Sequence, residues 1–230
     1  MSTKIAHIFD IDGTLVESTD FDTELFVSAA KRVMGDIQFS SDWNNYKDVT
    51  DSAIVRQIAA DHGRTNAETI IQDVRMIFGN LIFEYLNEHQ CIPIPGAKSM
   101  LEKLNSGHDN LVGFATGGWG HTARMKLESA GLRNDNIPLV SSDFHYKRQE
   151  IMLACKSLMA EVEHVIYIGD GLWDMKAARD LKWGFIGVGP KLKGENCIWI
   201  PDYLDSSWND APQRALRELE DISDLNLASA

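Results

Sequence analysis

The chain has 230 residues, of which 44% are hydrophobic and 24% are charged. This length is enough for one or two domains with a sizeable core, and the composition excludes a fibrous or disordered protein. The 34 acidic residues outnumber the 22 basic residues, which gives a formal net charge of -12. Because this negative field opposes binding to nucleic acid or to an anionic membrane, we expect neither as a partner.

The cysteines and the apolar runs bear on the cellular location. Cys91, Cys155 and Cys197 are widely spaced and form no Cys-x-x-Cys pair, so neither a disulfide framework nor a thiolate zinc site is indicated. The apolar stretch at residues 5–9 is too short for a signal peptide, and no apolar run approaches the length of a membrane span. We therefore expect a cytoplasmic protein.

Short apolar, β-rich segments alternate with segments of helical periodicity along most of the chain. This alternation is typical of right-handed βαβ units and predicts an α/β fold with a parallel sheet. The predicted strands cover residues 5–9, 111–115, 164–168, 184–188 and 197–200, and the predicted helices cover residues 97–104, 122–130, 150–159 and 175–181.

One region interrupts the alternation. Residues 20–88 contain no convincing strand, and their periodicity predicts helices only. The region is followed by Pro93 and Pro95, which restrict the backbone and predict a stiff return segment. The sequence thus predicts a core domain of residues 1–14 and 96–230 with a helical domain of residues 15–95 inserted into it.

A pair of acidic residues follows the first predicted strand. Asp10 and Asp12 are two residues apart in extended chain, so their side chains share a face. They lie at the carboxyl edge of the sheet, where open α/β folds bind ligands. Gly13 lets the chain turn away without crowding them.

The stretch Asp10-Ile11-Asp12-Gly13-Thr14 resembles the first motif of the haloacid dehalogenase superfamily, and further motifs of that family follow in order. A second strand ends at Thr116, Lys147 lies further along, and a Gly-Asp-x-x-x-Asp loop contains Asp170 and Asp174. The resemblance covers residues 1–200. It implies a doubly wound, Rossmann-like core and a helical cap domain in the family's common four-helix form.

The acidic residues point to a metal. Asp10, Asp12, Asp170 and Asp174 would bring four carboxylates to one edge, and these cannot all stay ionised without a cation. Mg²⁺ suits such oxygen ligands together with a substrate phosphate. The resemblance implies that the ligands are the Asp10 carboxylate, the Asp12 main-chain carbonyl and Asp170, with Asp174 bound directly or through water.

The residues of these motifs suit phosphoryl transfer. Asp10 is the predicted nucleophile, and Asp12 would protonate the leaving oxygen and then deprotonate water. The Thr116 hydroxyl and the Gly117 N–H would bind phosphoryl oxygens, and Lys147 would offset negative charge.

Two assignments stay open at this stage. The family commonly has proline after its lysine, where this chain has Arg148, so Lys147 and Arg148 both remain candidates, with Lys147 preferred. Residues 47–51 resemble the loop through which caps contact substrate, which makes Lys47 and Arg56 predicted substrate contacts. A solvated loop that caps the following helix would explain the same residues.

The sequence therefore predicts a Mg²⁺-dependent phosphatase that hydrolyses a small phosphorylated metabolite through an aspartyl phosphate. It is similar to phosphoglycolate phosphatase and to β-phosphoglucomutase, so a sugar phosphomutase is the alternative enzyme. A catalytically silent binding protein on the same scaffold is a third hypothesis, and it predicts decayed motifs, which are not seen. The substrate and the choice between monomer and homodimer remain undecided.

Overall fold

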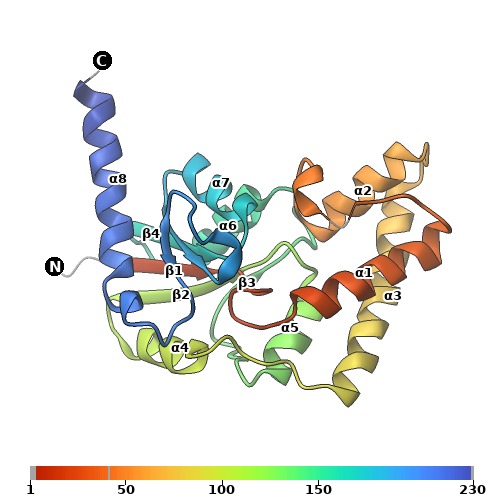
Figure 1. Ribbon diagram of the computed structural model, residues 1–230, viewed down its shortest axis with the longest axis horizontal. Helices are drawn as coiled ribbons and strands as arrows, with labels where there is room; N and C mark the ends of the chain where they lie inside the picture. Colours follow the sequence, from red (N-terminus) through yellow and green to blue (C-terminus); the bar gives the residue numbers. More distant parts are fainter. Residues whose placement is uncertain (1–3, 41, 229–230) are drawn as a thin grey trace.

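A six-stranded parallel sheet forms the centre of the computed structural model, which describes residues 4–40 and 42–228 (Figure 1). The strand order is β3-β2-β1-β4-β5-β6, so the chain winds outward in both directions from β1. The predicted α/β class is confirmed. The strands are β1 (Ile5–Phe9), β2 (Asn110–Ala115), β3 (Leu139–Val140), β4 (His164–Gly169), β5 (Gly184–Val188) and β6 (Ile198–Ile200).

Helices cover both faces of this sheet. Successive side chains of a strand point to opposite faces, and in β1 Phe9 joins one hydrophobic cluster while Ile8 joins the other. The first cluster includes residues of α4, α5 and α8, and the second includes residues of α6 and α7. These helices are α4 (Ala97–Ser106), α5 (Gly120–Ser129), α6 (Arg148–Ser157), α7 (Leu172–Asp180) and α8 (Ala211–Ala228).

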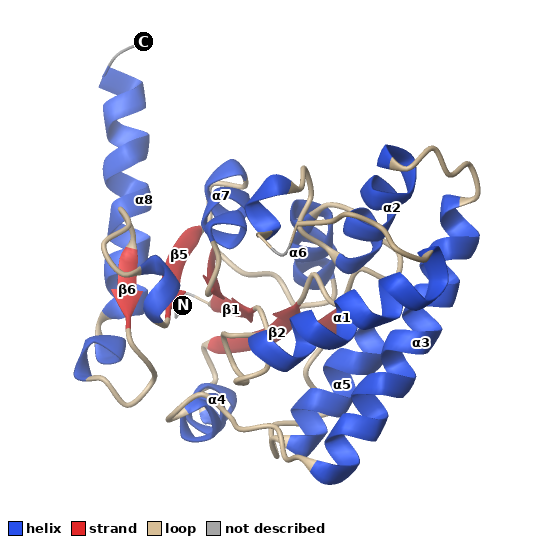
Figure 2. Ribbon diagram, turned by 45° about the vertical axis from the view of Figure 1, so that its right-hand side comes forward, coloured by secondary structure: helices blue, strands red, loops and turns tan. Residues whose placement is uncertain are grey.

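A block of helices lies between β1 and α4. It contains α1 (Thr19–Met34), α2 (Asp51–Asp61), α3 (Ala67–Glu88) and the short 3-10 helix η1 (Trp43–Asn45), so the described residues show three α-helices rather than the four that the resemblance implied. The block has a hydrophobic cluster of its own. In this block α3 packs against α1 and α2, and it also packs against the core helix α5, beside which it lies in Figure 2.

The chain enters and leaves this helical block through two paired linkers. Val16 and Pro93 form an antiparallel bridge. The Glu17 N–H donates to the Ile92 carbonyl at 2.8 Å, and the Ile94 N–H donates to the Leu15 carbonyl at 2.9 Å. Because the two linkers bind one another, the block is attached to the sheet by one short double-stranded connection.

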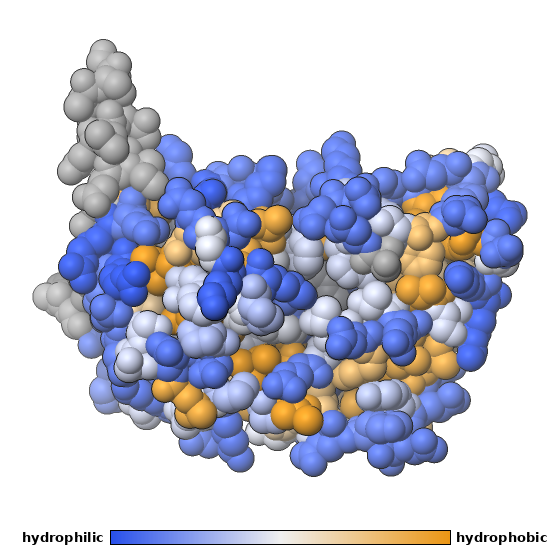
Figure 3. Space-filling model, in the orientation of Figure 1, coloured by the Kyte–Doolittle hydropathy of each residue, from blue (hydrophilic) through white to orange (hydrophobic). Residues whose placement is uncertain are grey.

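On the face seen in Figure 3, hydrophilic residues predominate and apolar residues form small separate areas. Within the described part of the chain, no helix combines the length and the apolar character that crossing a membrane requires.

Candidate active site

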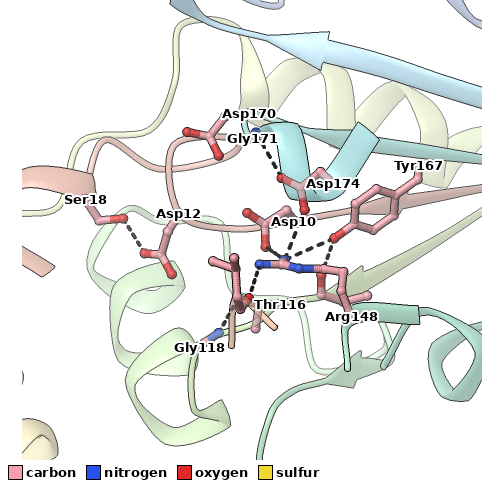
Figure 4. Close-up of polar contacts among 12 residues, drawn as sticks. Asp10, Asp12, Ser18, Thr116, Gly118, Arg148, Tyr167, Asp170, Gly171 and Asp174 are labelled. Atoms are coloured by element: carbon pink, nitrogen blue, oxygen red, sulfur yellow. Dashed lines mark hydrogen bonds and ion pairs between the residues drawn. The ribbon is translucent and has the colours of Figure 1, made fainter. Parts of the chain in front are cut away.

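The sheet edge that carries the predicted motifs borders a cavity of about 90 Å³. Asp10 follows β1, Thr116 follows β2 and Asp170 follows β4, so three neighbouring parallel strands deliver them to one place. Asp12 and Gly117 line the same cavity. The structure thus brings these predicted residues together (Figure 4).

Three buried carboxylates could hold a metal ion here. One oxygen from each of Asp10, Asp170 and Asp174 lies within 4.8 Å of the others. Asp174 lies in the first turn of α7, where its Oδ2 accepts a hydrogen bond of 3.1 Å from the Gly171 N–H. Its buried Oδ1 accepts no hydrogen bond and has only an ion-pair contact, with Arg148. Clustered oxygen donors with such an atom among them fit a hard divalent cation such as Mg²⁺.

The same carboxylates have perturbed acidities. Burial raises the pKa of Asp10 well above its ordinary value, with Arg148 opposing this shift and Asp174 and Asp170 reinforcing it. Burial also raises the pKa of Asp174, to about 6. Carboxylates with raised pKa values are stabilised in their ionised form by a nearby cation, so their electrostatics favour metal binding as well.

Arg148 is the cation that contacts Asp10 in this cavity. Its Nη1 donates a hydrogen bond of 3.0 Å to Asp10 Oδ1 and lies 3.2 Å from Asp174 Oδ1. Its Nη2 donates to the Val49 carbonyl of the helical block at 3.1 Å.

The structure places Lys147 and Arg148, the two candidates for the cation of the site, in different surroundings. Lys147 is exposed and precedes the first residue of α6, and it lines a separate surface pocket. Arg148, one position later, is buried and faces the sheet. The physical reason is the start of α6: the helix turns its first residue inward and leaves the preceding one in solvent.

The turn at residues 116–118 lies close to Arg148 and to the backbone of the helical block. The Thr116 hydroxyl accepts a hydrogen bond of 3.1 Å from the Gly118 N–H. A Cβ atom on Gly117 would lie 2.5 Å from Arg148 Nη2 and 2.8 Å from the Val49 carbonyl oxygen. Glycine is therefore required at position 117 for Arg148 and the helical block to meet.

Asp12 is held by a lysine that the sequence analysis missed. The Asp12 carboxylate accepts hydrogen bonds from the Ser18 hydroxyl and, at 2.5 Å, from Lys126 Nζ. Lys126 Nζ is also 2.5 Å from Asp22 Oδ1. Burial lowers the pKa of Lys126, but the two carboxylates outweigh it and the net shift is upward.

A second missed cation is Lys191, whose Nζ lies 2.6 Å from Asp170 Oδ2. Lys191 lines the cavity together with Trp173. It lies in the 3-10 helix Pro190–Leu192 that follows β5. A lysine shortly after a strand at the carboxyl edge of the sheet was the signal that could have found it.

The helical block contributes to the cavity through residues other than those predicted. Val49, Thr50 and Asp51 line it. Lys47 and Arg56 instead line the surface pocket that contains Lys147. The expected loop therefore reaches the site, but the two predicted substrate contacts do not, because both side chains point to the outer side of this loop and helix.

Trp119 belongs to the core domain but packs among the side chains of the helical block. It follows the Thr116–Gly118 turn but is fully buried in the cluster of the helical block. Its ring centroid is 5.9 Å from those of Phe26 and Phe78, and its Nε1 donates to the Ser52 hydroxyl at 2.9 Å. Of the two tryptophans near the motifs, Trp119 packs in the interior, whereas Trp173 lines the cavity.

Comparisons with known proteins agree with this geometry. The family model described as haloacid dehalogenase-like hydrolase matches residues 7–188. A hydrolase from Pseudomonas syringae is 23% identical with a TM-score of 0.70, and the match covers 89% of this chain and 95% of that chain. Comparison with curated proteins gave no match.

Two further solved structures are similar. A β-phosphoglucomutase from Clostridium difficile is 18% identical with a TM-score of 0.69, covering 93% of this chain and 97% of that one. A predicted phosphoglycolate phosphatase from Haemophilus somnus is 19% identical with a TM-score of 0.60, covering 89% and 96%. At these identities the likeness shows a shared fold.

Proposed function

Because the chain is an enzyme that belongs to the haloacid dehalogenase-like hydrolases, we propose that it is a Mg²⁺-dependent phosphatase acting on a small phosphate monoester. The observation that carries this proposal is the buried cluster of Asp10, Asp170 and Asp174 with Arg148 beside it. Such a cluster supplies a carboxylate nucleophile, metal ligands and a fixed positive charge at one point.

The reaction would proceed in two displacements. A carboxylate oxygen of Asp10 attacks phosphorus, which forms an acyl phosphate and breaks the bond to the leaving oxygen. Asp12 gives that oxygen a proton and later takes one from the water that releases phosphate and restores Asp10. Arg148 and the Thr116 hydroxyl would stabilise charge on the phosphoryl oxygens.

Mg²⁺ would be held by Asp10, Asp170 and Asp174, with the Asp12 main-chain carbonyl as a further ligand. When bound, it would neutralise charge on the phosphoryl group. Lys191, paired with Asp170, would keep that carboxylate oriented toward the metal.

The charges around the cavity favour hydrolysis over phosphoryl return to a sugar. A phosphomutase that works through an aspartyl phosphate must hold a bisphosphate midway through its cycle. Among the described residues that line the cavity, the cations are Arg148 and Lys191, and each is paired with an aspartate. Asp22 and Asp51 add negative charge to the lining. A second phosphate would meet carboxylates rather than a free cation.

The silent-scaffold hypothesis is disfavoured by the same site. Asp10, Asp12, Thr116 and Asp170 all line the cavity, and Arg148 takes the place of the expected lysine. A binding protein would have no need to retain both acidic residues after β1. The cytoplasmic location and the oligomeric state stay predictions.

The test is phosphate release from a panel of phosphate monoesters with Mg²⁺ and with EDTA. We expect hydrolysis of at least one monoester, and no activity for Asp10→Asn, which cannot form the covalent intermediate. With ³²P-labelled substrate, label in inorganic phosphate supports the proposal. Label that appears mainly on a second hydroxyl of a sugar would establish the phosphomutase instead.

A further inference from the structure

Lys126 joins three parts of the molecule. It lies on the core helix α5, is 1% exposed, and its Nζ is 2.5 Å from Asp12 Oδ1 and 2.5 Å from Asp22 Oδ1. Asp12 belongs to the loop after β1, and Asp22 belongs to α1 of the helical block. One buried ammonium group therefore bridges the proposed proton-transfer residue and the helical block.

The two carboxylate oxygens of Asp12 have different surroundings. Oδ1 accepts both hydrogen bonds, from Lys126 and from Ser18. Oδ2 lies 3.5 Å from the point that a Cβ atom on Gly118 would occupy, and Thr116 Oγ1 lies at the same distance from that point. Both Gly118 and Thr116 line the cavity. One oxygen is therefore occupied, and the other faces the place where substrate binds (Figure 4).

We propose that Lys126 is a positioning residue, which fixes Asp12 through Oδ1 so that Oδ2 exchanges the proton with the leaving oxygen. This inference rests on the proposed phosphatase function. Lys126 itself does not line the cavity and contacts no reacting atom. Lys126 affects the reaction only by orienting the Asp12 carboxylate.

Asp22 completes the arrangement. Without it, a buried ammonium would face Asp12 alone, and its position would depend on one contact. With it, Lys126 lies between two carboxylates and its place is fixed from both sides. Since Asp22 is on α1, the seating of the helical block on the core and the orientation of Asp12 depend on one another.

The distinguishing measurement is the dependence of kcat/KM on the leaving group, because kcat/KM reports the first displacement alone. In contrast, kcat also includes the release of phosphate by water, in which Asp12 acts for every substrate. An alkyl phosphate has a poor leaving group that needs a proton from Asp12, whereas p-nitrophenyl phosphate has a good one that hardly needs it. A misplaced Asp12 should therefore slow the alkyl substrate much more than the aryl substrate. A merely structural defect should slow both alike.

The variant must fold. Lys126→Met alone leaves the half-buried carboxylates of Asp12 and Asp22 close together without their shared cation, which is destabilising. The double variant Lys126→Met/Asp22→Asn removes a cation and a carboxylate together and keeps the local charge balance. Thr122→Val is the matched control, because Thr122 is buried on the same helix and donates to the Trp119 carbonyl at 2.9 Å.

In the double variant we expect kcat/KM for the alkyl phosphate to fall at least about tenfold more than kcat/KM for p-nitrophenyl phosphate. Thr122→Val should keep the wild-type ratio of the two rates. Adding the double substitution to Asp12→Asn should cause little further loss for the alkyl substrate, because both act through one group.

Equal losses for the two substrates in a folded double variant would overturn the role of Lys126 and leave the phosphatase proposal intact. The same holds for full additivity with Asp12→Asn. Wild-type protein that releases no phosphate from any monoester with Mg²⁺ would overturn the phosphatase proposal and this inference with it. Circular dichroism and thermal melting of each variant establish that it is folded.

Discussion

Arg148 Nη1 donates a hydrogen bond of 3.0 Å to Oδ1 of Asp10, and the two residues are 138 positions apart in the sequence. Both side chains are almost completely buried. The same guanidinium reaches the Val49 carbonyl through its other terminal nitrogen. Arg148 therefore connects the proposed nucleophile to the backbone of the helical block.

Replacing Arg148 tests whether it is the cation of the site. Arg148→Gln should lower kcat/KM by about 10²- to 10³-fold, because a preorganised charge at the phosphoryl group is lost. Lys147→Gln should stay within about twofold of wild type, because Lys147 is exposed and lies outside the cavity. Steady-state kinetics of the two neighbouring variants checks this, and the reverse ranking would restore Lys147 as the site lysine.

Metal binding should be visible in stability as well as in activity. Mg²⁺ at about 100 times its Kd should stabilise the metal-free protein by about 2.7 kcal/mol, since it relieves repulsion among buried carboxylates. Differential scanning fluorimetry should then show a rise in Tm. Asp174→Asn should remove most of that rise, whereas Asp135→Asn, an exposed control, should keep it. An identical rise in both variants would contradict a metal site at Asp174.

His7 makes stability depend on pH. Burial in the central strand lowers the pKa of His7 from 6.5 to about 4, so the folded protein keeps this ring neutral over a range in which the unfolded chain protonates it. In this range the unfolded state binds more protons than the folded state. The contribution of His7 to the free energy of unfolding therefore falls as pH decreases from 6.5 to 4. At pH 5 the loss should be about 2 kcal/mol relative to pH 8.

The check is urea unfolding of wild type and His7→Leu at both pH values. The difference in unfolding free energy between the two proteins should shift by about 2 kcal/mol in favour of His7→Leu at pH 5. A difference that does not change with pH would contradict this prediction, because it would mean that the pKa of His7 is the same in the folded and unfolded states.

Trp119 should hold the helical block in place. Trp119→Ala should cost about 3–5 kcal/mol of unfolding free energy, because it empties a fully buried site between Phe26 and Phe78. Trp119→Phe keeps most of the packing and loses the bond to Ser52, so it should cost about 1 kcal/mol for the hydrogen bond plus a smaller packing loss. Equal effects of the two substitutions in chemical unfolding would argue against a packing role.

The sequence predicted most of the sheet because β1, β2, β4, β5 and β6 are short, mostly apolar runs. All of them except β2, which Thr116 follows, end at or next to Gly, Asp or Pro. It missed β3, which has two residues and is too short for any periodicity to show. It also missed α8. This helix follows the last strand of the sheet, so it connects no two strands and the alternation of strands and helices does not predict it.

The sequence allowed prediction of those residues of the candidate site that directly follow a strand. Asp10, Thr116 and Asp170 follow their strands directly, so the sheet alone brings them together. Lys126 had no such signal, because it lies inside a helix and its partner Asp22 is 104 residues away. The choice between Lys147 and Arg148 depends on where α6 begins, and a boundary cannot be placed to one residue from periodicity.

The pairing of Val16 with Pro93 has a consequence for how this architecture diversifies. The helical block begins and ends at adjacent points of backbone, so its length and sequence can change without altering the register of any sheet strand. A replacement segment could enter and leave at the same two points, provided that it supplied equivalents of the contacts that Asp22, Val49 and Ser52 make with the core. New substrate preferences can arise in such proteins while the aspartates at the strand ends stay the same.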